Sequence, residues 1–335
     1  MPVTATVAIA LAAGFDAVLG EPPTRVHPVA LLGRLVARVD RGDGGGERND
    51  GMESDGDRPG GDPVWSRPRL VGLLVAFVLP LSFAAIAAGF VAVGAWINHW
   101  LGAVVAAGVL FSTTSLRLLL AEARTVISES DADLAAARVD LRALAGRDSD
   151  DLNPAHVRSA AVESLAENLA DGFVAPLFAF ALGAVAAATL VGPGVSLPLA
   201  AAAAAWVKGV NTLDSMLGYR SKPVGWASAR LDDAVIWLPA RLTALLIAVA
   251  AGAPTLVLRR RVRGLARRPA SPNSGWPMAT MAALLPARLH KPGVYDLDPR
   301  DSAPLPDVAT AARAVRMTRR AGIIAVGAAG VLAWF

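Results

Sequence analysis

Residues 70–111 read LVGLLVAFVLPLSFAAIAAGFVAVGAWINHWLGAVVAAGVLF and contain no Asp, Glu, Lys or Arg. About 20 consecutive apolar residues are enough for a helix to cross a bilayer, so this run is too long for one span. It predicts two membrane helices, joined either near residues 88–94 or near Asn98 and His99. A chain that carries such a run is expected to fold in a membrane.

Four more apolar stretches lie on either side of this run. They cover residues 2–20, 172–207, 234–258 and 321–335. Glycine and proline at residues 192–194, with Pro198, interrupt the second of them, which indicates a hairpin or a re-entrant element. We therefore expect an all-α, polytopic integral membrane helical bundle, a single membrane domain over residues 1–335, with polar helices and loops on the cytoplasmic side of the cell membrane.

The overall composition agrees with a membrane protein and excludes several kinds of site. Hydrophobic residues make up 54% of the chain, charged residues only 18%, and the mean hydropathy is +0.46. The chain has no cysteine, which excludes disulfides and zinc–thiolate sites, so any metal must bind oxygen or imidazole. Mg²⁺ fits that restriction best.

The charged residues outside the apolar stretches argue against a nucleic-acid partner. The net charge is +4, but the basic residues are spread over many loops rather than gathered on one helix. Residues 259–263 (RRRVR) directly follow an apolar run and are typical of a cytoplasmic anchor. Residues 41–63 are rich in Gly and Asp and predict a flexible linker. No phosphate-binding glycine motif is present.

A first polar block precedes the apolar run that starts at residue 172. Glu163, Glu167 and Asp171 are spaced four residues apart, so a helix would place them on one face, with Asn168 beside them. Three aligned carboxylates repel one another. They indicate a solvated acidic face, a Mg²⁺ site or a site for a basic side chain from another segment, and the spacing does not choose among these.

A second polar block, residues 208–233, lies between two apolar runs. Lys208, Asn211 and Ser215 share one helical face with Thr212, and Asp214 lies one position away. Arg230, Asp232 and Asp233 follow in the same block. A charge beside hydrocarbon costs several kcal/mol unless it finds a partner. The block therefore indicates a functional site, although Arg230 and Asp233 are also spaced to form a buried salt bridge with each other.

Further polar groups complete the pattern over nearly the whole chain. They are residues 20–23 (GEPP), 27–29 (HPV), 33–34 (GR), 163–168 (ESLAEN), 171–172 (DG), 175–177 (APL), Lys208 with 211–216 (NTLDSM), 225–233 (GWASARLDD), 239–243 (PARLT) and 271–278 (SPNSGWPM). In this order they resemble the membrane-bound adenosylcobinamide-phosphate synthases of cobalamin biosynthesis.

The resemblance implies an ATP-dependent ligase, an acid–amine ligase that forms a carbon–nitrogen bond. Its substrates would be adenosylcobyric acid and (R)-1-amino-2-propanol phosphate, or the free amino alcohol, and its product adenosylcobinamide phosphate. ATP would convert the carboxylate to an acyl phosphate, which needs Mg²⁺ and nearby cations. Other cobalamin-assembly enzymes are possible partners, beside the lipid bilayer.

The resemblance also suggests residue roles, which we state as expectations. The candidate residues fall into three groups according to the chemistry of their side chains. Carboxylates for Mg²⁺ or for proton transfer are Glu163, Glu167, Asp171, Asp214, Asp232 and Asp233, with Asp232 and Asp233 as candidate Mg²⁺ ligands. Cations for phosphate are Lys208, Arg230 and Arg34, and substrate-binding groups are His27, Asn168, Asn211, Ser215 and Asn273.

Two questions stay open at this level. A non-enzymatic transporter or scaffold for corrinoid biosynthesis would also carry polar blocks inside a helical bundle. In addition, ATP chemistry requires Asp214 and Asn273 on the same side of the membrane. If residues 234–258 formed one complete span, these two residues would lie on opposite sides.

Overall fold

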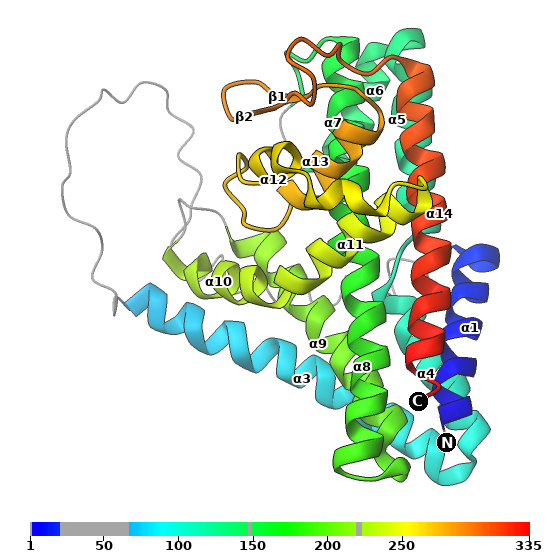
Figure 1. Ribbon diagram of the computed structural model, residues 1–335. Helices are drawn as coiled ribbons and strands as arrows, with labels where there is room; N and C mark the ends of the chain where they lie inside the picture. The colour runs from blue at the N-terminus through cyan, green and yellow to red at the C-terminus, as the bar shows by residue number, and fades with distance from the viewer. Residues whose placement is uncertain (1, 21–66, 147–148, 219–222) are drawn as a thin grey trace.

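The computed structural model describes residues 2–20, 67–146, 149–218 and 223–335. The predicted linker at 41–63 and the candidate residues His27 and Arg34 lie outside these ranges. Long helices pack side by side, and a group of shorter elements covers one end and one flank (Figure 1). The fold is helical, with one small hairpin in the described part.

The helices in chain order are α1 (Pro2–Leu19), α3 (Arg67–Ile97), α4 (His99–Thr113), α5 (Arg117–Ala132), α6 (Leu134–Ala145), α7 (Pro154–Leu169), the π-helical turn η1 (Ala170–Val174), α8 (Ala175–Leu190), the 3₁₀ turn η2 (Pro193–Val195), α9 (Ser196–Leu217), η3 (Pro223–Gly225), α10 (Trp226–Val235), α11 (Trp237–Ala250), η4 (Pro254–Leu258), α12 (Arg260–Leu265), α13 (Gly275–Leu284) and α14 (Val308–Leu332). The strands are β1 (Leu289–Lys291) and β2 (Tyr295–Leu297).

Three helical stretches in the described residues are long and apolar enough to cross a membrane: Arg69–Ile97, His99–Ala132 and Pro154–Leu190. Helix α3 also exposes large apolar side chains such as Leu74 and Phe90, both 65% exposed. In water such a surface would be unfavourable, whereas hydrocarbon accommodates it. The protein is an all-α membrane bundle, as the apolar runs predict.

The long run at 70–111 breaks at Asn98. The Asn98 side chain accepts a hydrogen bond from the backbone N–H of Trp100 at 2.8 Å and caps α4. Pro80 lies inside α3 without ending it. Of the two junctions considered, the structure has the one at Asn98, because an N-cap satisfies the first amides of the new helix, whereas residues 88–94 offer no such group.

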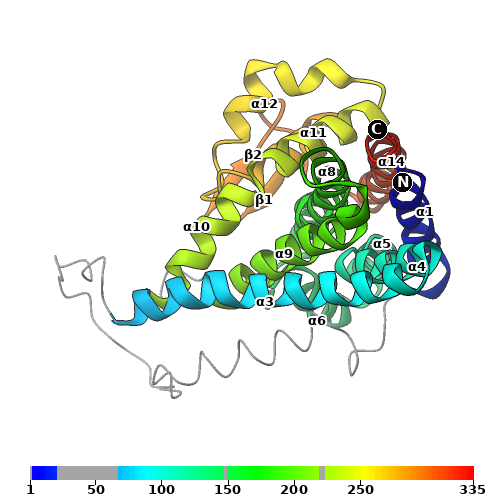
Figure 2. The same ribbon diagram turned by 90° about the horizontal axis from the view of Figure 1, so that it is seen from below.

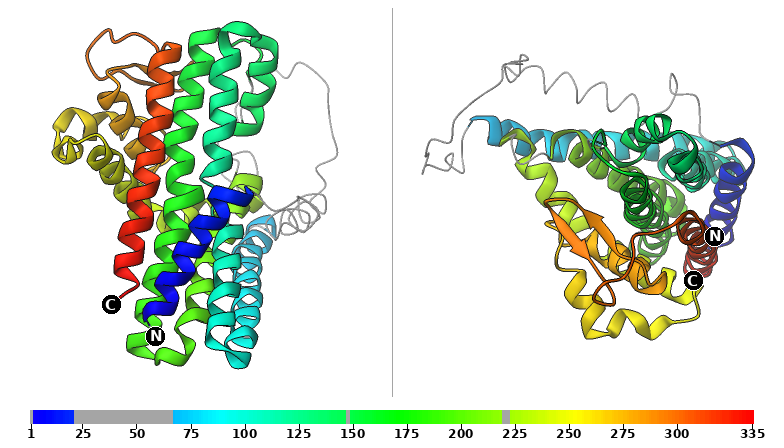
Figure 3. Two further views of the ribbon diagram at one scale, coloured as in Figure 1. Left: turned by 90° about the vertical axis from the view of Figure 1, so that its right-hand side faces the viewer. Right: turned by 90° about the horizontal axis from the view of Figure 1, so that it is seen from above.

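The apolar run at 172–207 forms a helical hairpin. Helices α8 and α9 pack against each other and are joined through η2, where Gly192 has a φ of 137°. Helix α8 continues α7 through the π-helical turn η1, so one long rod runs from Pro154 to Leu190 (Figure 3, left). The reversal lies at the end of the molecule where both chain termini are found (Figure 1).

The run at 234–258 is bent rather than straight. Helices α10 and α11 meet at Ile236 at an angle of 46°, and η4 turns the chain again. Figure 2 looks along the axes of α8 and α14 and shows α10 and α11 from the side, so these two helices run at a steep angle to the long ones. The chain therefore returns to the region of α9, and Asp214 and Asn273 line the same cavity. Asp214 and Asn273 are therefore not separated onto opposite sides of the membrane.

The sequence pattern did not predict the β1–β2 hairpin, because three-residue strands show no detectable alternation. The strands pair antiparallel, with His290 opposite Asp296. The hairpin docks on α7 through buried polar contacts: the His290 backbone N–H donates to Ser159 Oγ, and the Tyr295 hydroxyl donates to Glu163 Oε2, each at 2.8 Å.

We expect Tyr295→Phe to destabilise the protein by about 1–3 kcal/mol, because it leaves a buried carboxylate oxygen of Glu163 without that donor. Thermal unfolding of the purified protein in detergent measures the effect. Ser128→Ala, which removes an exposed hydroxyl bonded to the backbone oxygen of Thr125 in the same helix, serves as the control. An unfolding midpoint of Tyr295→Phe equal to that of the control would show that the docking contact contributes nothing.

Candidate functional site

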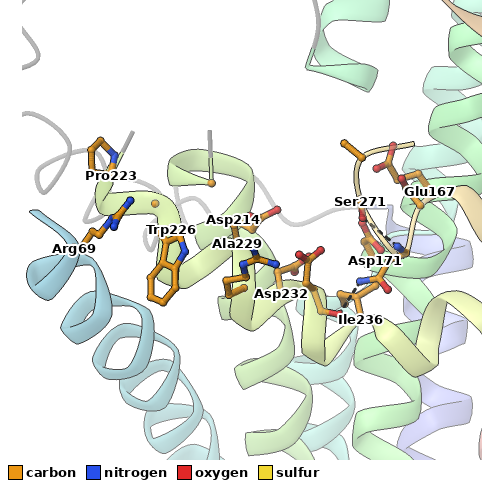
Figure 4. Close-up of a pocket in the computed structure, with 17 residues that line it drawn as sticks. Arg69, Glu167, Asp171, Asp214, Pro223, Trp226, Ala229, Asp232, Ile236 and Ser271 are labelled. Atoms are coloured by element: carbon orange, nitrogen blue, oxygen red, sulfur yellow. Dashed lines mark hydrogen bonds between the residues drawn. The ribbon is translucent and has the colours of Figure 1, made fainter. Parts of the chain in front are cut away.

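A cavity of about 620 Å³ opens where α3, η1, α9, α10 and the 270–274 loop converge. It is lined by Arg69, Glu167, Asp171, Asp214, Gly218, Pro223, Gly225, Trp226, Ala229, Arg230, Asp232, Asp233, Ile236, Ala270, Ser271, Asn273 and Ser274. Figure 4 shows Arg69 and Trp226 at one end, Glu167 and Asp171 at the other, and Asp214 and Asp232 between them. We call it the acidic cavity.

The two polar blocks of the sequence meet at this cavity. Glu167 and Asp171 come from α7 and η1, whereas Asp214, Asp232 and Asp233 come from α9 and α10. Their charges interact with one another across these elements. Five carboxylates facing one hollow repel, and a bound cation or a ring of basic groups lowers that repulsion.

Glu163 does not belong to this group. The structure directs its carboxylate to the hydroxyls of Ser159 and Tyr295, at 2.8 Å each, and it does not line the acidic cavity. Of the three carboxylates predicted to share one helical face, Glu167 and Asp171 line the cavity and Glu163 does not. The hairpin supplies the partner for Glu163, and the hairpin is distant in sequence.

Asp232 is the least exposed residue among the cavity carboxylates. It is only 9% exposed, and the side chain of Asn211 lies near its carboxylate. One carboxylate oxygen, Oδ1, is buried without a hydrogen-bond partner among the described residues. Buried polar atoms are nearly always satisfied, so an orphaned carboxylate oxygen on a cavity wall indicates a ligand that donates a hydrogen bond or carries positive charge.

Asp214 lies beyond the apolar part of α9 and outside the candidate spans. Burial, with a further contribution from Asp233, raises the pKa of Asp214 to about 6. At neutral pH the carboxylate is still mostly ionised, but it takes up a proton far more readily than an exposed aspartate. This is the property expected of a group that accepts a proton from an amine near neutral pH.

Basic groups face the same carboxylates. Arg69 and Arg230 line the cavity, and Lys208 on α9 interacts electrostatically with Asp171. Arg230 is exposed and forms no ion pair within 4 Å in the described part of the chain, although it interacts with Asp233 over a longer distance. The buried Arg230–Asp233 salt bridge considered from the spacing is therefore not formed, and Arg230 can reach a ligand.

Asn273 is held over the cavity by contacts from two other elements. Its side-chain amide donates to the backbone oxygen of Asp233 at 2.9 Å, and its Oδ1 accepts from Arg241 at 3.2 Å. The Arg241 guanidinium lies 4.1 Å from the ring centre of Trp237 and 5.0 Å from that of Trp276. This stack joins α11 to the start of α13, directly after the 270–274 loop.

The remaining predicted residues are not gathered at the cavity. Asn168 points to the backbone oxygen of Leu144 at the end of α6, at 3.4 Å. The exposed hydroxyl of Ser215 bonds to the backbone oxygen of Asn211. Neither residue lines the acidic cavity.

Conversely, sequence reasoning missed some residues of the cavity wall. These are chiefly Arg69, Trp226, Ser271 and Ser274. The last three belong to blocks already recognised as polar, so only their roles were overlooked. Arg69 directly precedes the 70–111 run, and its position at the start of an apolar helix was the available signal.

The donor set fits Mg²⁺ that is shared with phosphate. Among the described residues, no group of three or more His, Asp or Glu side chains is arranged to hold a metal by itself. Mg²⁺ in phosphate-binding sites takes only one or two carboxylates and completes its shell with phosphate and water. The orphaned oxygen of Asp232, beside Asp233, meets that requirement.

Comparison with known proteins supplies the family. The family model described as CobD/Cbib protein matches residues 9–322. The chain belongs to the CobD/CbiB family. A relative from Methanothrix thermoacetophila, named probable cobalamin biosynthesis protein CobD, is 34% identical over 94% of this chain and 92% of its own length.

Two further CobD/CbiB relatives carry the name cobalamin biosynthesis protein CobD. The one from Klebsiella pneumoniae is 37% identical over 84% of this chain and 80% of its own length. The one from Rhodobacter capsulatus is 36% identical over 93% and 92%, respectively. No solved structure matches the chain. The family is thus established by sequence similarity along almost the whole chain.

Proposed function

We propose that this chain is the ATP-dependent ligase that joins adenosylcobyric acid to (R)-1-amino-2-propanol phosphate, or to the free amino alcohol, in cobalamin biosynthesis. The names of the relatives support the pathway. The observation that carries the reaction type is the acidic cavity, in which carboxylates, an orphaned Asp232 oxygen and basic side chains face one another.

In the proposed reaction, a carboxylate oxygen of the corrinoid attacks the γ-phosphorus of ATP and releases ADP. The amine then attacks the acyl carbon, and inorganic phosphate leaves as the amide bond forms. Arg230 and Arg69, which line the cavity, and Lys208, which interacts with Asp171, are proposed to neutralise the transferring phosphate. Mg²⁺, held by Asp232 and Asp233, would add Lewis-acid stabilisation of that charge.

The amine must lose a proton before it attacks. Asp214 and Glu167 both line the cavity, and the raised pKa of Asp214 suits it to receive that proton. Asn273 lines the same cavity, and the side chain of Asn211 lies near Asp232. These two amides are proposed to bind the polar rim of the corrinoid.

The proposal is tested with purified protein in detergent, supplied with adenosylcobyric acid, the amino alcohol phosphate, Mg²⁺ and ATP. We expect amide product and ADP in equal amounts. Glu167→Gln and Asp214→Asn, assayed separately, should each lower the rate at least about tenfold. Full activity in both variants would remove these blocks from the site. Counterflow of substrate in sealed vesicles without coupled ATP cleavage would instead indicate a transporter.

We further propose that the protein crosses the cell membrane several times with the acidic cavity on the cytoplasmic side. The chain contains no cysteine, so single-cysteine labelling has no background. Ser302→Cys, in the segment that follows the β1–β2 hairpin, should react with a membrane-impermeant maleimide only after the cells are broken and the cytoplasmic face becomes accessible. Val191→Cys, exposed at the α8–α9 reversal, should react in intact cells. The opposite pattern would invert the orientation.

A further inference from the structure

A groove follows α14 on a side of the molecule away from the acidic cavity. It consists of three hollows of about 410, 530 and 430 Å³. The first two share Arg124 and Arg319, and the last two share Val326, so the hollows follow one another along the helix. Figure 3, left, views the side on which α14 and α1 lie next to each other. We call this feature the α14 groove.

We call the part of the α14 groove around Arg316 and Arg319 its upper part, and this part is cationic. Arg124 on α5 and Arg316 and Arg319 on α14 line it, and all three are exposed. None of them takes part in an ion pair within the described part of the chain. Asp16, a carboxylate that lines the groove, already accepts hydrogen bonds from the backbone amides of Leu116 and Arg117. Positive charge in the upper groove is therefore left for a ligand.

The lower part of the α14 groove, around Val326 and Val331, is apolar. Ile9 on α1 and Val326, Val331 and Phe335 at the end of the chain line it. The hydroxyl of Thr6 is bonded to a backbone oxygen of α14, so it offers no free polar group to a ligand. Such a surface fits hydrocarbon and not a free anion in water.

We propose that the α14 groove binds one anionic glycerophospholipid. The arginines hold the phosphate, and an acyl chain lies between α1 and α14. Twelve helical residues separate Arg319 from Val331, or about 18 Å. One leaflet of hydrocarbon is about 15 Å thick, half of a bilayer core. Basic pockets between membrane helices are suited to anionic lipid headgroups, and a free phosphate would leave the apolar half of the groove uncovered.

The test uses the delipidated full-length protein in a neutral detergent, titrated with phosphatidylglycerol or phosphatidylcholine, with bound lipid counted by native mass spectrometry. Arg316→Gln/Arg319→Gln should weaken phosphatidylglycerol binding about 25-fold, the product of about fivefold for each arginine. Arg313→Gln/Arg320→Gln removes the same charge from the same helix outside the groove and should change binding less than about threefold.

A third variant tests the apolar half. A Cβ at Gly327 meets nothing within 4 Å, so Gly327→Leu fits the fold and occupies the space of the acyl chain. It should weaken phosphatidylglycerol binding about tenfold with no change in charge. Equal losses in the two arginine pairs, unchanged binding in Gly327→Leu, equal affinity for phosphatidylcholine, or displacement of the lipid by 1 mM inorganic phosphate would each overturn the proposal.

Discussion

Asp232→Asn is expected to lower ATP-dependent amide formation at least about a hundredfold, which corresponds to about 2.7 kcal/mol of transition-state stabilisation. The buried Oδ1 has no hydrogen-bond partner in the described protein and lies on the cavity wall beside the proposed phosphate-binding groups. Asparagine keeps the size of the side chain but cannot ionise to hold a cation. The loss should therefore appear in catalysis and in the Mg²⁺ dependence rather than in folding.

Initial rates over a range of ATP and Mg²⁺ concentrations measure this effect. Asp140→Asn, the same substitution at an exposed position on α6, is the matched control and should keep wild-type kcat/KM. Thermal unfolding of both variants separates a lost charge from a lost fold. Asp232→Asn with wild-type rates would show that the orphaned oxygen serves no step of the reaction.

Gly72→Ala should destabilise the protein by about 3 kcal/mol or more and inactivate it. Gly72 is buried on α3, and a Cβ there would stand 2.0 Å from the backbone oxygen of Val224 in η3. Backbone cannot rotate away as a flexible side chain can, so α3 and η3 must separate. That separation would displace Arg69 and Trp226, which line the same end of the acidic cavity (Figure 4).

Gly89→Ala on the same helix is the matched control, because a Cβ there meets nothing within 4 Å. Alanine favours helix over glycine by about 0.8–1 kcal/mol, so the control should be neutral or slightly stabilised. Thermal unfolding in detergent and the amide-formation assay compare the two variants. Equal midpoints for Gly72→Ala and Gly89→Ala would mean that the close approach of α3 and η3 is not rigid.

Much of the helical fold follows from local features of the chain. The length of the 70–111 run required two helices, and Asn98 offered a side chain able to cap the second. Gly192 and Pro193 marked the reversal between α8 and α9 in the same way. Spanning length, caps and helix breakers act within a few residues of one another, which is why they are readable without a structure.

The composition of the site was predictable, but its membership was not. Glu167, Asp171, Asp214 and Asp232 were expected from their blocks, and the acidic cavity contains all four. Glu163 shares their spacing but is bonded to the hairpin residue Tyr295, 132 positions away. No helical periodicity could anticipate a partner from so remote a segment.

Apolar runs, breakers and ordered polar blocks were therefore sufficient for the fold class and the family, because each is a property of neighbouring residues. The meeting of Asp214 with Asn273 depends on the bend at Ile236 and on the Asn273 amide that bonds to the Asp233 backbone. The orphaned oxygen of Asp232 depends on burial by several elements at once. Such features arise only when segments distant in sequence pack together, since burial and charge proximity are properties of the packed chain.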